Sequence, residues 1–94
     1  MPFEVDTDSR LSIPPQVMSR LVGDETVLLD MATGIYFGLD GVGKRIWESV
    51  ADGQTVGQAA ATIAGEYDVE RARAETDVIE FVGELLERGL LLRN

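Results

Sequence analysis

The stretch LLDMATGIYFGLDGVGKRIW, residues 28–47, decides the fold of this chain. The segment from Met31 to Gly34 predicts a turn, because Gly34 can adopt a positive φ at no steric cost. Ile35–Leu39 then forms a short strand. Asp40 takes the N-cap position of a helix, where a carboxylate accepts hydrogen bonds from unsatisfied helical N–H groups. The sequence therefore predicts a hairpin that runs directly into a helix.

The strand Ile35–Leu39 contains neither proline nor lysine. Natural sheets usually protect an exposed edge with such residues. Alternation along the strand places Ile35, Phe37 and Leu39 on the core face and leaves Tyr36 on the other face. If this strand lies at an edge of the sheet, another chain can add a strand to it.

Residues 1–15 are polar and end in a double proline, so they are expected to form a flexible N-terminal arm. Residues 16–94 are expected to form a single domain. Two strands are predicted at its start, over residues 16–21 and 26–29, with a turn at Gly23 and Asp24.

Three helices are predicted after the hairpin. The first ends near residue 50, the second follows an N-cap at Thr55 and ends near residue 67, and the third follows an N-cap at Asp68. Gly89 ends the third helix, and residues 90–92 either pack on the core or add a short strand. Strands first and helices after predict an α+β fold: a three-stranded antiparallel sheet followed by three helices, similar to a winged helix-turn-helix.

Helical spacing separates a buried stripe on the third helix from its flank. Ala74, Asp77 and Phe81 lie one turn apart and form a row along that flank, which is expected to stay accessible. On the first helix, Trp47 is expected in the core. The central stripe of the third helix consists of Val78, Val82, Leu85 and Leu86.

The composition excludes several kinds of chemistry. The chain has no cysteine and no histidine, so disulfides, histidine-based triads and zinc sites built on these residues are ruled out. Seventeen acidic residues against eight basic ones give a net charge of -9, which opposes binding to phosphate backbones. There is no run long enough for a membrane span and no export leader, so a cytoplasmic location is expected.

Three short motifs suggest a ligand or a reaction, but each departs from its pattern. The glycine-rich run at residues 38–45 misses the spacing of a phosphate loop and lacks its hydroxyl, which favours a tight connection. Ser9 follows an aspartate, as in acyl carrier proteins, but Arg10 stands where leucine is required. Glu80, Glu84 and Glu87 share a helix face that is expected to be solvated.

Four motifs in the same order resemble the family of the pyrroloquinoline-quinone biosynthesis protein D. They are LDxxTGxYxxLDxxGxxIW at residues 29–47, DGxTV at 52–56, DVxxFVxxL at 77–85 and GLL at 89–91. Each motif alone is weak, whereas the set is fairly specific and the resemblance spans about residues 16–93.

The resemblance implies a non-catalytic peptide chaperone that needs no cofactor. That family is the stand-alone recognition element for ribosomally made, modified peptides (RiPPs), and it binds the leader of a precursor peptide as a strand added to the third strand, beside the third helix. It then presents the precursor to a modifying enzyme. Carried over to this chain, the peptide-binding residues are Ile35, Tyr36, Phe37 and Gly38 on the strand and Ala74, Asp77, Val78 and Phe81 on the helix.

The chain departs from the quinone-cofactor branch, since it lacks a Pro-Glu pair before the strand and has Ala51 where a cysteine is common. Its combination of Tyr36, Asp40 and Trp47 is similar to leader-binding proteins of split lasso-peptide systems. The implied partner is a leader-cleaving cysteine protease in the lasso branch, or a radical SAM-type modifying enzyme otherwise. Neither nucleic acid nor membrane is expected as a partner, and both monomer and homodimer stay open.

A winged-helix DNA-binding regulator is the alternative, from a different class of protein. That function needs a basic recognition helix with phosphate contacts. Here the third helix carries only Arg71, Arg73 and Arg88 against several carboxylates. The sequence therefore favours peptide recognition over DNA binding.

Overall fold

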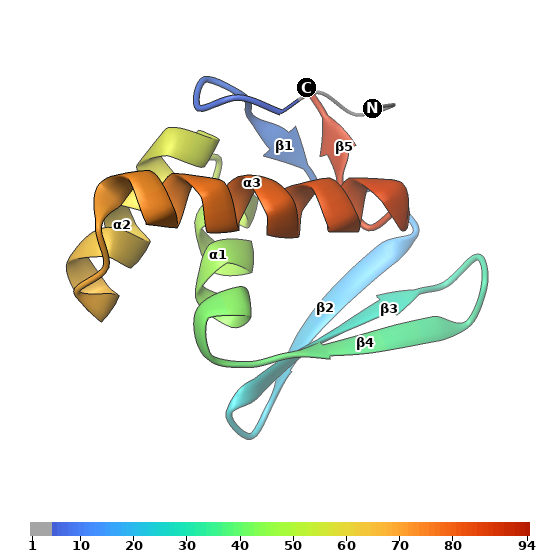
Figure 1. The fold of residues 1–94 in the computed structure, drawn as a ribbon. Coiled ribbons are helices and arrows are strands. Elements are labelled where there is room, and N and C mark those ends of the chain that lie inside the picture. Colours follow the sequence, from blue (N-terminus) through green and yellow to red (C-terminus); the bar gives the residue numbers. More distant parts are fainter. Residues whose placement is uncertain (1–4) are drawn as a thin grey trace.

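The computed structural model describes residues 5–94 and places three helices on one side of a three-stranded sheet (Figure 1). The antiparallel sheet has the order β2-β3-β4, and a small second sheet pairs β1 with β5. The predicted α+β class is confirmed. The elements are β1 (Leu11–Ser12), β2 (Val17–Val22), β3 (Glu25–Asp30), β4 (Ile35–Leu39), α1 (Gly41–Ala51), α2 (Val56–Tyr67), α3 (Arg71–Glu87) and β5 (Leu92–Arg93).

The turn between β3 and β4 forms as its residues predict. Gly34 has a φ of 77°, and its N–H donates to the carbonyl oxygen of Asp30 at 2.8 Å. The Asp30 carboxylate accepts the N–H of Ala32 at 2.9 Å. This turn sets a register in which Leu28 of β3 lies opposite Phe37 of β4. Leu28 is fully buried, so the register directs this face of the sheet toward the helices.

The helix boundaries confirm two of the three predicted cap positions and correct the third. Asp40 is the N-cap of α1, although its side chain accepts no capping hydrogen bond. Thr55 begins α2 with a reciprocal capping box, in which its hydroxyl accepts the N–H of Gln58 and the Gln58 side chain accepts the N–H of Thr55. Asp68 was predicted to begin α3, but it ends α2 in the left-handed conformation, at a φ of 55°. Aspartate tolerates this conformation better than most residues. Glu70 is the N-cap of α3 instead.

Residues 5–15, which were predicted as part of a flexible arm, contact the rest of the domain, while residues 1–4 lie outside the described part of the chain. The carbonyl oxygens of Thr7 and Ser9 accept the first N–H groups of α2, from Gly57 and Val56, each at 2.9 Å. Leu11 is 3% exposed and pairs with Arg93 of β5. The segment satisfies amides that a helix start leaves without partners, so it folds as part of the domain.

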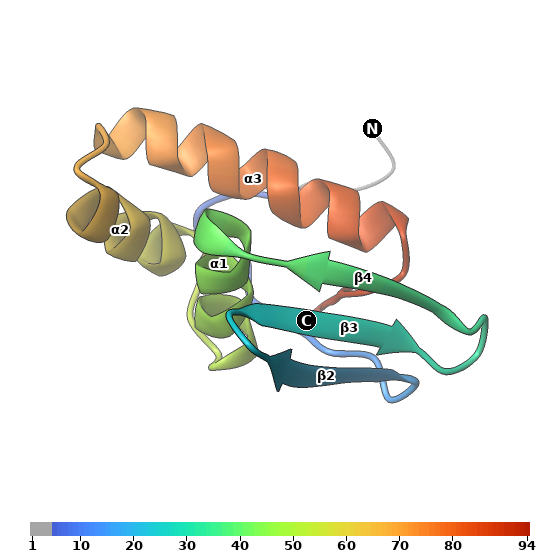
Figure 2. The ribbon, with the colours of Figure 1, turned by 90° about the horizontal axis from the view of Figure 1, so that it is seen from below.

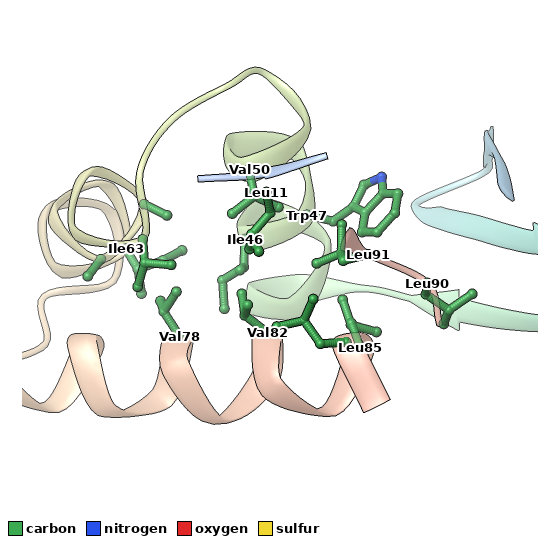
Figure 3. Packing of buried hydrophobic residues seen from close by; sticks show 14 of the residues in the cluster. Leu11, Ile46, Trp47, Val50, Ile63, Val78, Val82, Leu85, Leu90 and Leu91 are labelled. Carbon is green, nitrogen blue, oxygen red and sulfur yellow. The ribbon is translucent and has the colours of Figure 1, made fainter. Parts of the chain in front are cut away.

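The core lies between the helices and the inner face of the sheet. Val78, Val82 and Leu85 point from α3 into the core, Val78 toward Ile63 of α2 and Val82 toward α1 (Figure 3), which confirms the predicted stripe. Trp47 is 2% exposed, as predicted.

Outside the core, Arg45 of α1 hydrogen-bonds Glu66 of α2. This contact lowers the pKa of the Glu66 carboxyl and raises the pKa of Arg45.

The outer face of the sheet has no helix over it in the described structure (Figure 2). The register aligns Met18, Leu29 and Tyr36 across the three strands on this face. Tyr36 is the most exposed of the three, at 70%. None of the helices within residues 5–94 has the length and apolar character needed to cross a membrane.

Candidate functional site: the surface between β4 and α3

The strand β4 forms one margin of the sheet (Figure 2). On its outer side it pairs with no strand of the described chain, so its backbone groups there are available to another chain. Ile35 and Tyr36 are exposed, Gly38 is exposed, and Phe37 is half-buried against the core. The expected open edge is therefore present. Ile35 departs from the expected core face, because it lies beside the turn where the helices no longer cover the sheet.

Side chains of α3 reach across to the strand and to the start of α1. The guanidinium carbon of Arg88 lies 5.0 Å from the centre of the Phe37 ring, a cation–π contact. Nearer the middle of α3, Phe81 is half-buried, and its ring lies so close to Gly43 that a Cβ there would be 3.3 Å from it. Glycine at position 43 thus lets the Phe81 ring rest between α3 and α1.

One flank of α3 lies beside β4 and carries four polar or aromatic side chains. Asp77, Phe81, Glu84 and Arg88 recur at helical spacing along it. Asp77 forms an ion pair with Arg73, at 3.7 Å, and Arg88 forms one with Glu84, at 3.2 Å. Exposed pairs of this kind contribute little to stability. These two ion pairs therefore hold their side chains in place only weakly.

We call this region the β4–α3 surface: Ile35, Tyr36, Phe37 and Gly38 of the strand with Asp77, Phe81 and Glu84 of the helix and Arg88 at its C-cap. Six of the eight residues that the resemblance implied lie on it. That they contact a peptide stays a prediction.

The other two implied residues, Ala74 and Val78, do not lie on this surface. Both are 0% exposed and belong to the core. The expectation that Ala74 stays accessible is wrong because α2 packs closely on α3: its Ala59 and Ala60 are small and also fully buried. The buried face of α3 is therefore wider than the stripe that large apolar residues mark.

The prediction missed Glu84 and Arg88 as neighbours of the strand. Their signal is present in the sequence, because they follow Phe81 by three and seven residues and so share its flank. Glu84 was assigned to the solvated back of the helix, and it is indeed exposed. Only the contact of Arg88 with Phe37 shows that this flank turns toward β4.

An open sheet edge beside a helix flank with an aromatic side chain and paired charges is typical of domains that bind an extended chain. The model of the family Coenzyme PQQ synthesis protein D (PqqD) matches residues 25–91. The chain belongs to the PqqD family.

Three solved structures share the fold. TbiB1 in complex with the TbiA(beta) leader peptide is 40% identical, with a TM-score of 0.80 over 85% of this chain and 93% of that one. A lasso peptide synthetase B1 complexed with its leader peptide is 30% identical, with a TM-score of 0.83 over 88% and 98%. The PqqD truncation of Methylobacterium extorquens PqqCD, a stand-alone RiPP recognition element, is 25% identical, with a TM-score of 0.79 over 98% of each chain. No curated protein matches the chain.

These similarities concern peptide recognition, and the DNA-binding alternative gains no support from them. The fold explains why the chain resembles a winged helix although DNA binding gains no support. Three helices and a small sheet give the general outline, but the charge of the chain and the open β4 edge point to a peptide rather than to phosphates.

Proposed function

We propose that this protein is a non-catalytic recognition element that binds the leader of a ribosomally made precursor peptide and presents the peptide to a processing enzyme. The observation that carries the proposal is the open β4 edge beside α3. Two of the structures that share most of this fold are described as complexes with leader peptides, which supports the same function here.

In this proposal the leader adds a strand to β4. Backbone hydrogen bonds supply affinity without regard to sequence, and the side chains supply register and specificity. Alternate leader side chains face inward, where Phe37 and Phe81 offer half-buried aromatic rings. The remaining leader side chains face outward beside Tyr36. Asp77 and Arg88 offer one charge of each sign to polar leader residues.

The branch of the family that fits best is the lasso-peptide one. The two lasso-type structures are 40% and 30% identical to this chain, against 25% for the PqqD domain. The partner enzyme is then a leader-cleaving protease, with a radical SAM-type enzyme as the choice for the quinone-cofactor branch. Because precursor peptides are made on ribosomes, the protein acts in the cytoplasm.

Amide hydrogen exchange, measured by NMR with and without the precursor leader peptide, tests the proposal. Under saturating leader, the amides of residues 35–38 that face outward from β4 are expected to exchange at least about tenfold more slowly, because they gain hydrogen bonds from the added strand. A scrambled leader of the same composition is the control and should give no protection. Protection confined to the helices would contradict strand addition at β4.

A further inference from the structure

Gly38 interrupts the side chains along β4, although its backbone conformation does not require glycine. It is not among the glycines that have a positive φ. A glycine inside a strand often marks a bulge or a place where another group approaches closely. The register around Gly38 is continuous, with Val27 of β3 directly opposite, so β4 has no bulge there. The missing side chain therefore leaves room for another group on this face of the strand.

The group that occupies this room is the carboxylate of Glu25, which belongs to β3. A Cβ atom on Gly38 would lie only 2.7 Å from its Oε1, a distance that Cβ atoms essentially never show. Alternation places Gly38 on the same outer face as Tyr36, so the carboxylate also lies on that face. Glu25 is exposed and forms no ion pair within residues 5–94. The open edge strand thus has an unpaired carboxylate lying over its backbone.

Two basic side chains come from elements near Glu25, and both are directed to the side of the sheet away from the open edge. Arg20 lies on β2, opposite Val27, so Val27 separates it from the edge. Lys44 of α1 donates to the backbone carbonyl oxygen of Asp24, at 3.3 Å, in the turn between β2 and β3. A base that approaches from the β4 edge therefore meets the Glu25 carboxylate without a competing partner.

A peptide strand added to β4 places one of its residues directly opposite Gly38, with the side chain on the same outer face. The added strand lies about 4.8 Å from β4. No side chain of Gly38 stands between that residue and the Glu25 carboxylate. A lysine or arginine side chain is long enough to cross one strand spacing and brings the opposite charge, whereas a short side chain does not reach.

We propose that Glu25 determines specificity by pairing with a lysine or arginine of the leader at the position opposite Gly38. This inference rests on the proposed function and deepens it, because backbone pairing alone does not choose a register. A shift of the leader by one residue moves the basic side chain to the other face of the sheet, where it no longer reaches Glu25. The charge pair therefore fixes the register of the added strand, and a leader with a carboxylate at this position is repelled.

A charge-reversal experiment with the synthetic leader of the cognate precursor peptide tests this inference. Each lysine and arginine of the leader is replaced in turn with glutamate, and calorimetric titration measures the affinity for wild type and for Glu25→Lys. Glu25→Lys should bind the unchanged leader at least about tenfold more weakly, because repulsion replaces attraction. One reversed leader should bind wild type at least about tenfold more weakly and bind Glu25→Lys to within about threefold of the original affinity, which shows that the two positions are coupled.

Asp8→Lys is the matched control, because it changes the net charge of the chain by the same amount. Asp8 is also exposed and forms no ion pair within the described residues, but it lies in the segment that contacts the start of α2. Its leader affinity should stay within about twofold of wild type. Because both substituted positions are exposed, neither variant should melt more than about 4 °C below wild type.

Three results would overturn the inference: an unchanged leader affinity of Glu25→Lys, a loss of affinity that no reversed leader restores, and a wild-type complex with a leader that contains neither lysine nor arginine. Equal losses in Glu25→Lys and Asp8→Lys would also overturn it, since the net charge of the chain would then explain the effect. Failure of the wild-type protein to bind the leader at all would refute the proposed function itself.

Discussion

Replacing Ala74 with glutamate is expected to destabilise the domain strongly. Ala74 is fully buried on the face of α3 that packs against α2. A glutamate there either buries a charge without a partner, at a cost of about 3–5 kcal/mol, or forces the two helices apart. A domain of this size is stable by only about 5–15 kcal/mol, so the loss is a large share of the total.

Thermal unfolding followed by circular dichroism measures the effect, and the melting temperature of Ala74→Glu should fall by at least about 15 °C. The control is Ala72→Glu, the same substitution two residues earlier in α3, where the side chain is exposed. An acidic residue in the first turn of a helix interacts favourably with the helix dipole, so this variant should melt like wild type or slightly higher. A stable Ala74→Glu protein would show that α2 and α3 separate easily.

Ala74 was predicted to be accessible but is buried, because the sequence does not show how closely two helices pack. Alanine is compatible with a buried and an exposed face alike, so its position depends on how closely the neighbouring helix approaches. Ala59 and Ala60 of α2 are small and fully buried, so they allow the two helices to pack closely. Which residues of α3 they cover depends on the angle between the two helices, and that angle has no local signal.

Turn and capping residues were predicted correctly where neighbouring residues alone determine the structure. Gly34 in its turn and Thr55 with its capping box both occupy their expected positions, because each satisfies neighbouring backbone groups. The pairing of β1 with β5 could not be predicted in this way. Leu11 and Arg93 are partners more than eighty residues apart, in strands of two residues each. Neither strand is long enough to show alternation, so only the complete fold brings them together.

The open edge of the sheet was predicted from the sequence, but the helix side of the site was predicted only in part. The absence of proline and lysine in β4 predicted that the strand is accessible, and the sheet order places it at the margin. The same sequence rule applies to β2, where it was not used. For the helix side of the site, the row through Phe81 was predicted, but its end at Arg88 was not, because only the folded chain shows that Arg88 lies over Phe37.

Phe81→Ala is expected to weaken leader binding at least about tenfold, which corresponds to about 1.4 kcal/mol. Phe81 is half-buried, so one side of its ring supports the core and the other is available to an inward-facing leader side chain. Removing the ring therefore acts on both the fold and the ligand. The loss of packing should cost the free protein about 1–2 kcal/mol. A control must separate these two effects.

Ile79→Ala provides that control. Ile79 is also half-buried and packs against the same core, but it lies two residues from Phe81, so it points about 200° away around the helix. It should lose a similar amount of stability, and calorimetric titration should find its leader affinity close to that of wild type. If Ile79→Ala weakened the leader as much as Phe81→Ala does, binding would depend on the general stability of α3. If neither variant changed the affinity, the leader would bind elsewhere than beside Phe81. A loss specific to Phe81→Ala would place the leader between β4 and this flank of α3, where the open edge and the aromatic ring lie together.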